Sequence, residues 1–252
     1  MQPEPVVGDA FGELLRAVYR GGGRRGVEVE VIERDDGFVY TKEPARYFDD
    51  VLAWSSSAVW AVERASGRVL DIGVGAGRHA LAAADNGCAV LGLDPSPGAV
   101  DVVRERGQDA IVGSIETADR ILAGRRFDTL FLLGQNLGLL HSPAVAPELL
   151  TRLATLVEPG AIIVGTGSDP TKAPALHTGY LRLNRDRGRW PGQFTLRIRF
   201  RNLATDWYEY FMCTPDELEH LARGTGWVLE DRHVDGSDYA AMLRYRPDTK
   251  PR

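Results

Sequence analysis

Short apolar runs alternate with segments of helical periodicity from residue 68 onward. The runs lack polar alternation, which is typical of strands in a parallel sheet that helices cover on both faces. They are Val69–Ile72, Ala89–Leu93, Ala110–Val112, Phe127–Leu133 and Ala161–Val164. Helix signals separate them, for example the cap Ser96 and first-turn Pro97 before a helix that ends at Gly107. This alternation of strand and helix signals predicts an α/β fold built on a doubly wound sheet.

The segment before this alternation, residues 1–66, has a mixed pattern. Apolar residues recur at helical spacing near Phe11–Tyr19. After a break rich in Gly and Arg, Val27–Val31 alternates valine with glutamate, which predicts a half-exposed strand. Residues 45–65 have a helical pattern rich in aromatic residues. We expect an N-terminal, mainly helical lid.

A second departure lies at residues 169–213. Phe194–Arg201 alternates apolar residues with threonine or arginine at a period of two, and the aromatic stretch Trp207–Met212 follows after a short connection. This pattern predicts an antiparallel hairpin inserted into the main domain.

The main pattern then resumes and closes the chain. Thr214, Pro215 and Glu217 form a capping box with proline at the first helical position. Two further strands are predicted at Trp227–Val234 and Tyr239–Tyr245. The expected organisation is a lid over 1–66, a main domain formed by 67–168 with 214–246, and a substrate cap over 169–213.

Composition narrows the class of protein. The 252 residues carry a net charge of −5, which argues against a dedicated nucleic-acid binder. Two distant cysteines predict neither a disulfide framework nor a metal site of the CxxC type. The longest uncharged apolar stretch, 129–140, is shorter than the ~20 residues that span a bilayer. With no signal-peptide pattern at the start, we expect a cytoplasmic protein with no membrane partner.

A glycine-rich turn follows the first buried strand. The sequence V-L-D-I-G-V-G-A-G-R-H places Gly73, Gly75 and Gly77 before a helix, whose first N–H groups are free to bind a ligand. The dinucleotide fingerprint G-x-G-x-x-G requires glycine at 78, where this chain has Arg78. One acid, Asp71, precedes the first glycine by two residues. A second acid, Asp94, ends the next strand, where a carboxylate can accept both ribose hydroxyls. Two acids around this turn suit a neutral adenosine joined to a cationic sulfonium better than a pyrophosphate.

Residues 67–168 resemble the core of class I S-adenosylmethionine-dependent methyltransferases. The matching stretches are V-L-D-I-G-V-G-A-G-R-H-A, V-L-G-L-D-P-S-P-G-A-V, F-D-T-L-F-L-L and L-V-E-P-G-A-I-I-V, in this order. Residues 214–246 are similar to that family's last helix and hairpin. The resemblance implies a seven-stranded, Rossmann-like sheet with an antiparallel last strand, and S-adenosylmethionine as the cofactor.

The same resemblance implies which residues bind the cofactor. Asp71, Gly73, Gly75 and Gly77 would hold the methionine end, with Asp94 on the ribose and Ser96 nearby. Ser114 and Ile115 would border the adenine, although the family often has an acid near position 114. Leu133, Gly134 and Gln135 would line the sulfonium side.

The sequence specifies the methyl acceptor less closely than the cofactor. Methyl transfer from a sulfonium needs chiefly orientation and exclusion of water, and a general base is optional. Asn136, His141 and Tyr180 are the candidate catalytic residues, as orienting groups or as a base. The fourth strand ends Leu-Leu-Gly-Gln-Asn, without the Asn/Asp-Pro-Pro-Tyr of enzymes that methylate amino groups of DNA bases. It also lacks the acid with which the catechol type binds Mg²⁺, so no metal is expected.

The inserted region leaves several functions open. Residues 182–201 hold seven arginines and one acid, which suits an anionic substrate, an RNA-facing patch or an ordinary solvated face. The arginine face could equally pair with a second copy of the chain in a homodimer. An aromatic cap over a small acceptor is suggested by Trp190, Trp207, Tyr208 and Tyr210. Tyr40, Tyr47 and Trp54 could form a second lid.

Methylation of O or N on a small molecule, such as a secondary metabolite, is the function we expect. An RNA or protein methyltransferase that uses the arginine face is the alternative. A non-catalytic nucleotide-binding module is a second alternative. An NAD-dependent oxidoreductase ranks lowest because Arg78 stands where the dinucleotide fingerprint has glycine.

Overall fold

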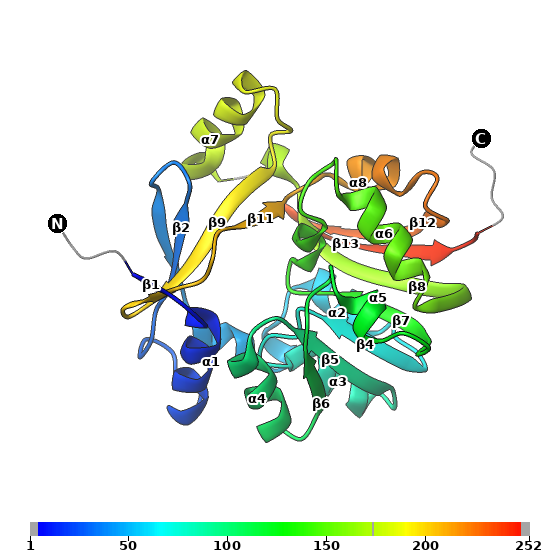
Figure 1. Cartoon of the computed structure of the whole chain (residues 1–252), viewed down its shortest axis with the longest axis horizontal. Coiled ribbons are helices and arrows are strands. Elements are labelled where there is room, and N and C mark those ends of the chain that lie inside the picture. Colours follow the sequence, from blue (N-terminus) through cyan, green and yellow to red (C-terminus); the bar gives the residue numbers. More distant parts are fainter. Residues whose placement is uncertain (1–4, 173, 248–252) are drawn as a thin grey trace.

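The computed structural model describes residues 5–172 and 174–247 of the chain. Two β-sheets lie on opposite sides of the molecule, a large one covered by helices and a smaller one that includes β2, β9 and β11 (Figure 1). No helix in the described part of the chain combines the length and the apolar character needed to cross a bilayer.

The large sheet has seven strands in the order β12-β13-β8-β7-β4-β5-β6. The five strands from β8 to the edge strand β6 run parallel, while β13 is antiparallel to both of its neighbours, β8 and β12. The bounds are β4 Arg68–Ile72, β5 Ala89–Asp94, β6 Asp109–Val112, β7 Phe127–Leu132, β8 Val157–Ser168, β12 Trp227–Asp235 and β13 Asp238–Tyr245. The predicted seven-stranded, doubly wound sheet with an antiparallel last strand is confirmed.

Helices bury both faces of this sheet because successive side chains of a buried strand point to opposite faces. On β4, Leu70 and Ile72 pack with residues of α5, α6 and α8, whereas Val69 packs with residues of α2 and α3. The helices are α2 Ser56–Val62, α3 Arg78–Asp85, α4 Pro97–Glu105, α5 Ala118–Ile121, α6 Ala146–Ala154 and α8 Pro215–Ala222. The capping box predicted at the start of α8 is present.

The smaller sheet, here called the lid sheet, joins the N-terminal segment to the insert. Its strand order is β1-β10-β9-β2-β3, and β11 also pairs with β9. The bounds are β1 Val6–Val7, β2 Glu30–Arg34, β3 Val39–Lys42, β9 Gln193–Phe200, β10 Leu203–Ala204 and β11 Tyr208–Phe211. The predicted antiparallel pairing of the two inserted strands is confirmed by β9 and β11.

The structure corrects the reading of the N-terminal segment as mainly helical. Besides α1 (Ala10–Arg20), it contributes three strands, and only short 3₁₀ turns η1 (Pro44–Phe48) and η2 (Val51–Ala53) precede α2. The strand predicted at 27–31 lies at Glu30–Arg34, and it buries the polar ends. Glu30 and Arg34 can be buried because each has polar partners, Tyr47 and Asp36 respectively.

Three further elements lie around these sheets. The insert contains a helix, α7 (Ala175–Asp186), that the sequence pattern does not predict, preceded by η4 (Pro170–Lys172). A 3₁₀ turn, η3 (Asn136–Leu140), follows β7. Helix α1 crosses α4 where both have glycine: a Cβ on Gly98 would lie 2.6 Å from the Cα of Gly12. This close approach brings the start of α1 to the carboxyl end of β5.

Candidate active site

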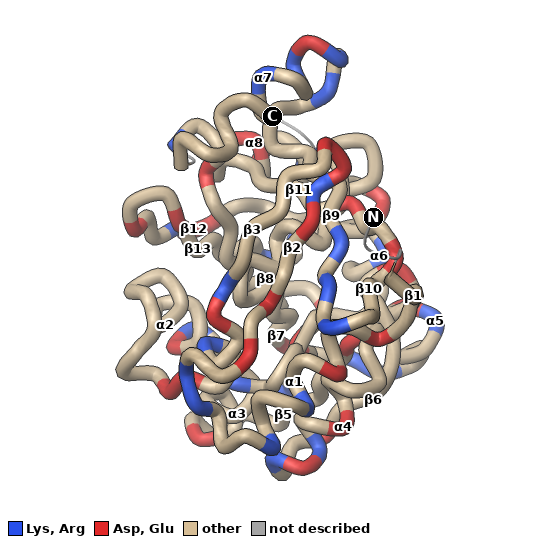
Figure 2. The backbone as a smooth tube through the Cα atoms, turned by 90° about the vertical axis from the view of Figure 1, so that its left-hand side faces the viewer, with Lys and Arg blue, Asp and Glu red and all other residues tan. Residues whose placement is uncertain are grey.

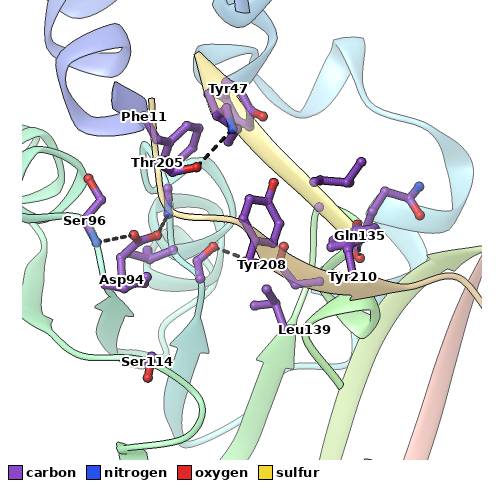
Figure 3. Close-up of a pocket in the computed structure, with 18 of the residues that line it drawn as sticks. Phe11, Tyr47, Asp94, Ser96, Ser114, Gln135, Leu139, Thr205, Tyr208 and Tyr210 are labelled. Carbon is purple, nitrogen blue, oxygen red and sulfur yellow. Dashed lines mark hydrogen bonds between the residues drawn. The ribbon is translucent and has the colours of Figure 1, made fainter. Parts of the chain in front are cut away.

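A cavity of about 700 Å³ lies between the two sheets. Its floor is made by the loops after β4, β5, β6 and β7, at the carboxyl ends of the parallel strands where ligands bind in sheets of this kind. Its roof is the inner face of the lid sheet. Figure 3 shows Asp94 and Ser96 on one side, Gln135 and Tyr210 on the other, and the ring of Tyr208 between them.

The glycine turn after β4 takes a conformation that favours glycine at each predicted position. Gly73, Gly75 and Gly77 have φ of +73°, +55° and +80°, in the left-handed region. A Cβ on Gly73 would lie 2.5 Å from the amide nitrogen of Asn136. Gly73 and Gly75 line the cavity, while Gly77 caps α3 and is absent from the described lining.

Asn136 holds this turn in place. Its Nδ2 donates to the carbonyl oxygens of Ile72 at 3.0 Å and Gly73 at 2.8 Å. Both amide hydrogens are therefore used on the backbone, which leaves only the side-chain oxygen for a ligand. The structure brings Asn136 to the cavity but favours a positioning role over the predicted contact with the acceptor.

Asp94 lies at the cavity beside the turn. One carboxylate oxygen accepts from the backbone N–H of Gly75 and the other from that of Ser96, both at 2.9 Å. Burial raises the pKa of Asp94 to about 6, although these two hydrogen bonds act in the opposite direction. Each oxygen keeps a further lone pair, so the carboxylate can still accept two hydroxyl donors. Ser96 caps α4 and donates to Asp9 at 2.7 Å.

Asp71, expected to hold the methionine end of the cofactor, lies on β4 and is not among the described residues that line the cavity. It is 1% exposed, and its Oδ2 has no hydrogen-bond partner among the described residues. Burial first, and the nearby charge of Asp94 second, raise the pKa of Asp71 to about 7. A buried carboxylate oxygen without a donor is costly, and a cation bound at the adjoining turn would reduce that cost.

The loop after β6 carries an acid that the sequence reasoning missed. Ser114 and Ile115 line the cavity as predicted, and so does Glu116, which is hydrogen-bonded to the Nε2 of His141. This hydrogen bond lowers the pKa of Glu116 to about 2 against the effect of burial. His141 therefore braces the loop expected to border adenine. The family's preference for an acid near position 114 was the available signal.

Gln135 is fixed at the end of β7 by three hydrogen bonds. Its N–H donates to Thr166 at 2.9 Å, its carbonyl accepts from the hydroxyl of Tyr210 at 2.5 Å, and its side-chain oxygen accepts from Ser168 at 3.0 Å. The residue has a left-handed φ of +75° and lines the cavity. Leu133 and Gly134, next to it, also line the cavity. Tyr210 thus docks the lid sheet onto the loop predicted to face the sulfonium.

Tyr180, a candidate catalytic residue from the sequence, is placed by the structure in the packing between α7 and the lid sheet. It is 1% exposed and is absent from the described lining of the cavity. Its ring stacks on Phe194 with centroids 5.1 Å apart, and its hydroxyl donates to Asp35 at 2.6 Å. The side chain packs α7, a helix that the sequence pattern does not predict, onto the lid sheet.

The lid sheet and the N-terminal segment bring to the cavity several aromatic residues suggested as lids, together with charged residues that the sequence did not single out. Tyr208 and Tyr210 line the cavity, as an aromatic cap requires, whereas Trp207 is 43% exposed. The N-terminal segment adds a group of polar and charged side chains to the same lining: Glu30, Tyr40, Lys42, Arg46 and Tyr47. The sequence analysis predicted a strand at Val27–Val31 but did not identify Glu30, Lys42 or Arg46 as residues that face the cavity.

The arginine-rich face of β9 is compensated by acids. Arg197 and Arg199 pair with Glu33 of β2 at 2.8 Å and 3.4 Å, and Arg201 pairs with Glu28 at 3.4 Å. The guanidinium of Arg197 also lies over the ring of Trp207, at 4.6 Å. Figure 2 shows basic and acidic residues side by side on β2 and β9. This face is therefore no uncompensated basic patch.

Comparison with known proteins finds a matching domain family and solved structures of similar fold. Residues 69–160 match the methyltransferase domain family. A SAM-dependent methyltransferase from Bacteroides fragilis, solved with S-adenosyl-L-homocysteine, is 20% identical, with a TM-score of 0.78 over 94% of this chain and 95% of that one. The CcbJ methyltransferase from Streptomyces caelestis is 19% identical, with a TM-score of 0.58 over 75% of this chain and 94% of that one.

A third similar structure holds an acceptor as well. The 1,6-didemethyltoxoflavin-N1-methyltransferase from Burkholderia thailandensis, with bound 1,6-didemethyltoxoflavin and S-adenosylhomocysteine, is 18% identical, with a TM-score of 0.52 over 78% of this chain and 81% of that one. No curated protein matches the chain by sequence. At these identities the structural likeness establishes the fold, and the domain match covers the strands and loops that form the cavity floor.

Proposed function

We propose that this chain, a class I S-adenosylmethionine-dependent methyltransferase by its domain and its fold, methylates O or N of a small molecule. The observation that carries the proposal is the 700 Å³ cavity, which joins the glycine turn and Asp94 to a chamber roofed by the lid sheet. Small-molecule sites occupy about 300–1,000 Å³, so this space suits a cofactor with a small acceptor.

The residues of the floor fit S-adenosylmethionine. Asp94 offers its remaining lone pairs to the ribose hydroxyls, and the glycine turn leaves the backbone open to the methionine end. The unpartnered oxygen of Asp71 suits a nearby cation. Ser114 and Ile115 would border adenine, and Leu133, Gly134 and Gln135 would line the sulfonium side. The solved relatives from Bacteroides and Burkholderia were crystallised with S-adenosylhomocysteine, which supports the choice of cofactor.

The chain's own contribution to the chemistry is positioning and exclusion of water. When bound, the cofactor supplies an activated methyl group, so displacement needs an acceptor atom held in line. Tyr210 holds the roof to the floor at Gln135, and Asn136 holds the turn at Gly73. His141 has one ring nitrogen hydrogen-bonded to Glu116, so we assign it to bracing that loop. The reaction then depends on orientation more than on a dedicated base.

The rival functions have less support. Four of the seven arginines that an RNA or protein methyltransferase would use have acidic partners. Arg197 and Arg199 pair with Glu33, Arg201 with Glu28 and Arg189 with Glu209. A dinucleotide would need glycine where Arg78 stands. A non-catalytic binding module has no need of the aromatic chamber above the floor.

Calorimetry with S-adenosylmethionine, S-adenosylhomocysteine, NAD and a mixed-sequence RNA tests the proposal. We expect the two adenosyl sulfur compounds to bind with 1:1 stoichiometry, and NAD and RNA to bind at least about tenfold more weakly. Tight binding of NAD with no response to either sulfur compound would overturn the assignment. RNA binding with a steep dependence on salt concentration would favour the RNA alternative.

A further inference from the structure

We infer that Lys42, on the inner face of the lid sheet, selects an acceptor that carries a carboxylate group. The inference rests on the proposed function and names the substrate class of the same cavity. It starts from the register of β2 and β3, in which Glu30 lies directly opposite Lys42 and Ile32 directly opposite Tyr40. Residues opposite one another across an antiparallel pair share a face, and all four line the cavity.

Lys42 has no anionic partner in the described part of the chain. Within residues 5–172 and 174–247, no hydrogen bond or ion pair engages its ammonium group, which lies 5.9 Å from the ring centroid of Tyr40. The guanidinium of Arg46, which also lines the cavity, likewise has no carboxylate within ion-pair distance among those residues. Glu30 accepts one hydroxyl, that of Tyr47, at 3.0 Å and 3.2 Å from its two oxygens. Lys42 and Arg46 thus face the chamber beside the carboxylate of Glu30.

These charges are close enough to act on one another. Burial lowers the pKa of Lys42, the carboxylate of Glu30 acts against this, and the charge of Arg46 adds to the lowering. Burial raises the pKa of Glu30, and Lys42 acts against it. A partly buried ammonium that repels a neighbouring guanidinium gains most from an anion placed between them.

The other acids near Lys42 do not supply that anion. Asp238 acts on Lys42 through space, but its carboxylate accepts from Ser168 at 2.6 Å. Two further acids line the cavity from the segment around β11: Glu209 accepts from Thr195 at 2.8 Å, and Asp206 is exposed. The anion must therefore come from a bound molecule.

The surroundings indicate what kind of molecule carries the anion. Tyr40 and Tyr208 offer rings, and Ile32 and Leu196 offer apolar surface to the same chamber. A small ring compound with a carboxylate matches both parts. The cofactor also has a carboxylate, at its methionine end. We assign Lys42 to the acceptor because it lies on the roof, on β3, and the residues expected to hold the methionine end lie on the floor.

Calorimetry on the protein saturated with S-adenosylhomocysteine tests this inference. The probes are benzoate, 4-hydroxybenzoate and indole-3-carboxylate, each compared with its neutral amide. We expect at least one carboxylate to bind about tenfold more tightly than its amide, and Lys42→Met to remove that preference while leaving the amide affinity unchanged. Lys172→Met is the matched control, because that lysine pairs with Asp169 and is not among the described residues that line the cavity.

Three outcomes would overturn the inference. The first is that none of the three carboxylates binds, and the second is that Lys42→Met leaves the preference intact. The third concerns the cofactor: Lys42→Met would weaken S-adenosylhomocysteine but not 5′-methylthioadenosine, which lacks the amino-acid carboxylate. Failure of wild-type protein to bind S-adenosylhomocysteine at all would instead reject the proposed function, and this inference with it. Thermal melts of both variants confirm that the proteins compared are folded.

Discussion

Asp71 should lower the stability of the protein without cofactor, and Asp71→Asn should remove that burden. The carboxyl is buried on β4, with one oxygen lacking a partner among the described residues. Burial and the charge of Asp94 raise its pKa from 3.8 to about 7. A shift of about three pKa units corresponds to an upper limit of ~4 kcal/mol in the free energy of unfolding.

The pH dependence of this penalty follows from the direction in which the pKa of Asp71 is shifted. Below pH 3.8 the carboxyl is protonated in both the folded and the unfolded chain, so Asp71 carries no penalty. Between pH 3.8 and about 7 the unfolded chain ionises first, and the folded state loses stability as the pH rises. The advantage of Asp71→Asn should therefore be at most ~2 kcal/mol at pH 5 and at most ~4 kcal/mol at pH 8.

Urea denaturation at pH 5 and pH 8, with and without S-adenosylhomocysteine, measures the free energy of unfolding of the free and the ligand-bound protein. Without ligand, Asp71→Asn should unfold at higher urea than wild type, and more so at pH 8. With ligand at 100 times its Kd, wild type should gain about 3 kcal/mol and the variant less. Asp109→Asn, at an exposed aspartate of β6, is the control. Equal stability of Asp71→Asn and wild type at pH 8 would refute the reasoning.

Four further predictions concern the floor and the lid. Asp94→Ala should weaken S-adenosylhomocysteine by at least about tenfold in calorimetry, because charge-assisted hydrogen bonds to the ribose are lost; unchanged affinity would exclude the ribose assignment. Tyr210→Phe should cost about 1 kcal/mol in urea denaturation, because the hydrogen bond to Gln135 is lost. Gly138→Ala should cost more, since its Cβ would overlap the Tyr210 ring; a smaller loss would mean that the lid is not docked there. Hydrogen exchange in residues 5–60 should slow when S-adenosylhomocysteine binds, and no protection would count against a lid.

The core sheet could be predicted because its information is local. Apolar runs without alternation mark strands buried on both faces, and Leu70 and Val69 indeed pack on opposite sides of β4. The glycine turn was equally readable, since three left-handed positions in five residues demand glycine. The capping box at Thr214 is a third signal of this local kind.

The pairing of the N-terminal strands with the insert in the lid sheet could not be predicted, because it is not local. Strand β2 pairs with β9, which lies more than 150 residues later in the chain, and no local pattern specifies that register. The alternation at Val27–Val31 predicted a half-exposed strand, yet the strand begins at Glu30, which is buried with Tyr47, while Val27 and Val29 precede it and are exposed. Buried polar residues depend on partners from other elements, so the local pattern could not show that Glu30 is buried.

Tyr180 illustrates the same limit within the candidate site. A tyrosine in an insert above the floor could reach the cavity, but α7 turns its ring onto Phe194 and away from the chamber. Lys42, in contrast, lines the cavity although the sequence analysis did not single it out. A lysine near a strand end is ordinary in sequence, and only the register with Glu30 places it inside.

A crystal structure with S-adenosylhomocysteine is the most direct measurement of the central claim. The account predicts the ribose hydroxyls within hydrogen-bond distance of the Asp94 carboxylate, the amino-acid end over the turn at Gly73–Gly77, and the sulfur facing the chamber below Tyr208. The ligand bound elsewhere, or side chains filling the space between Asp94 and the lid sheet, would contradict it.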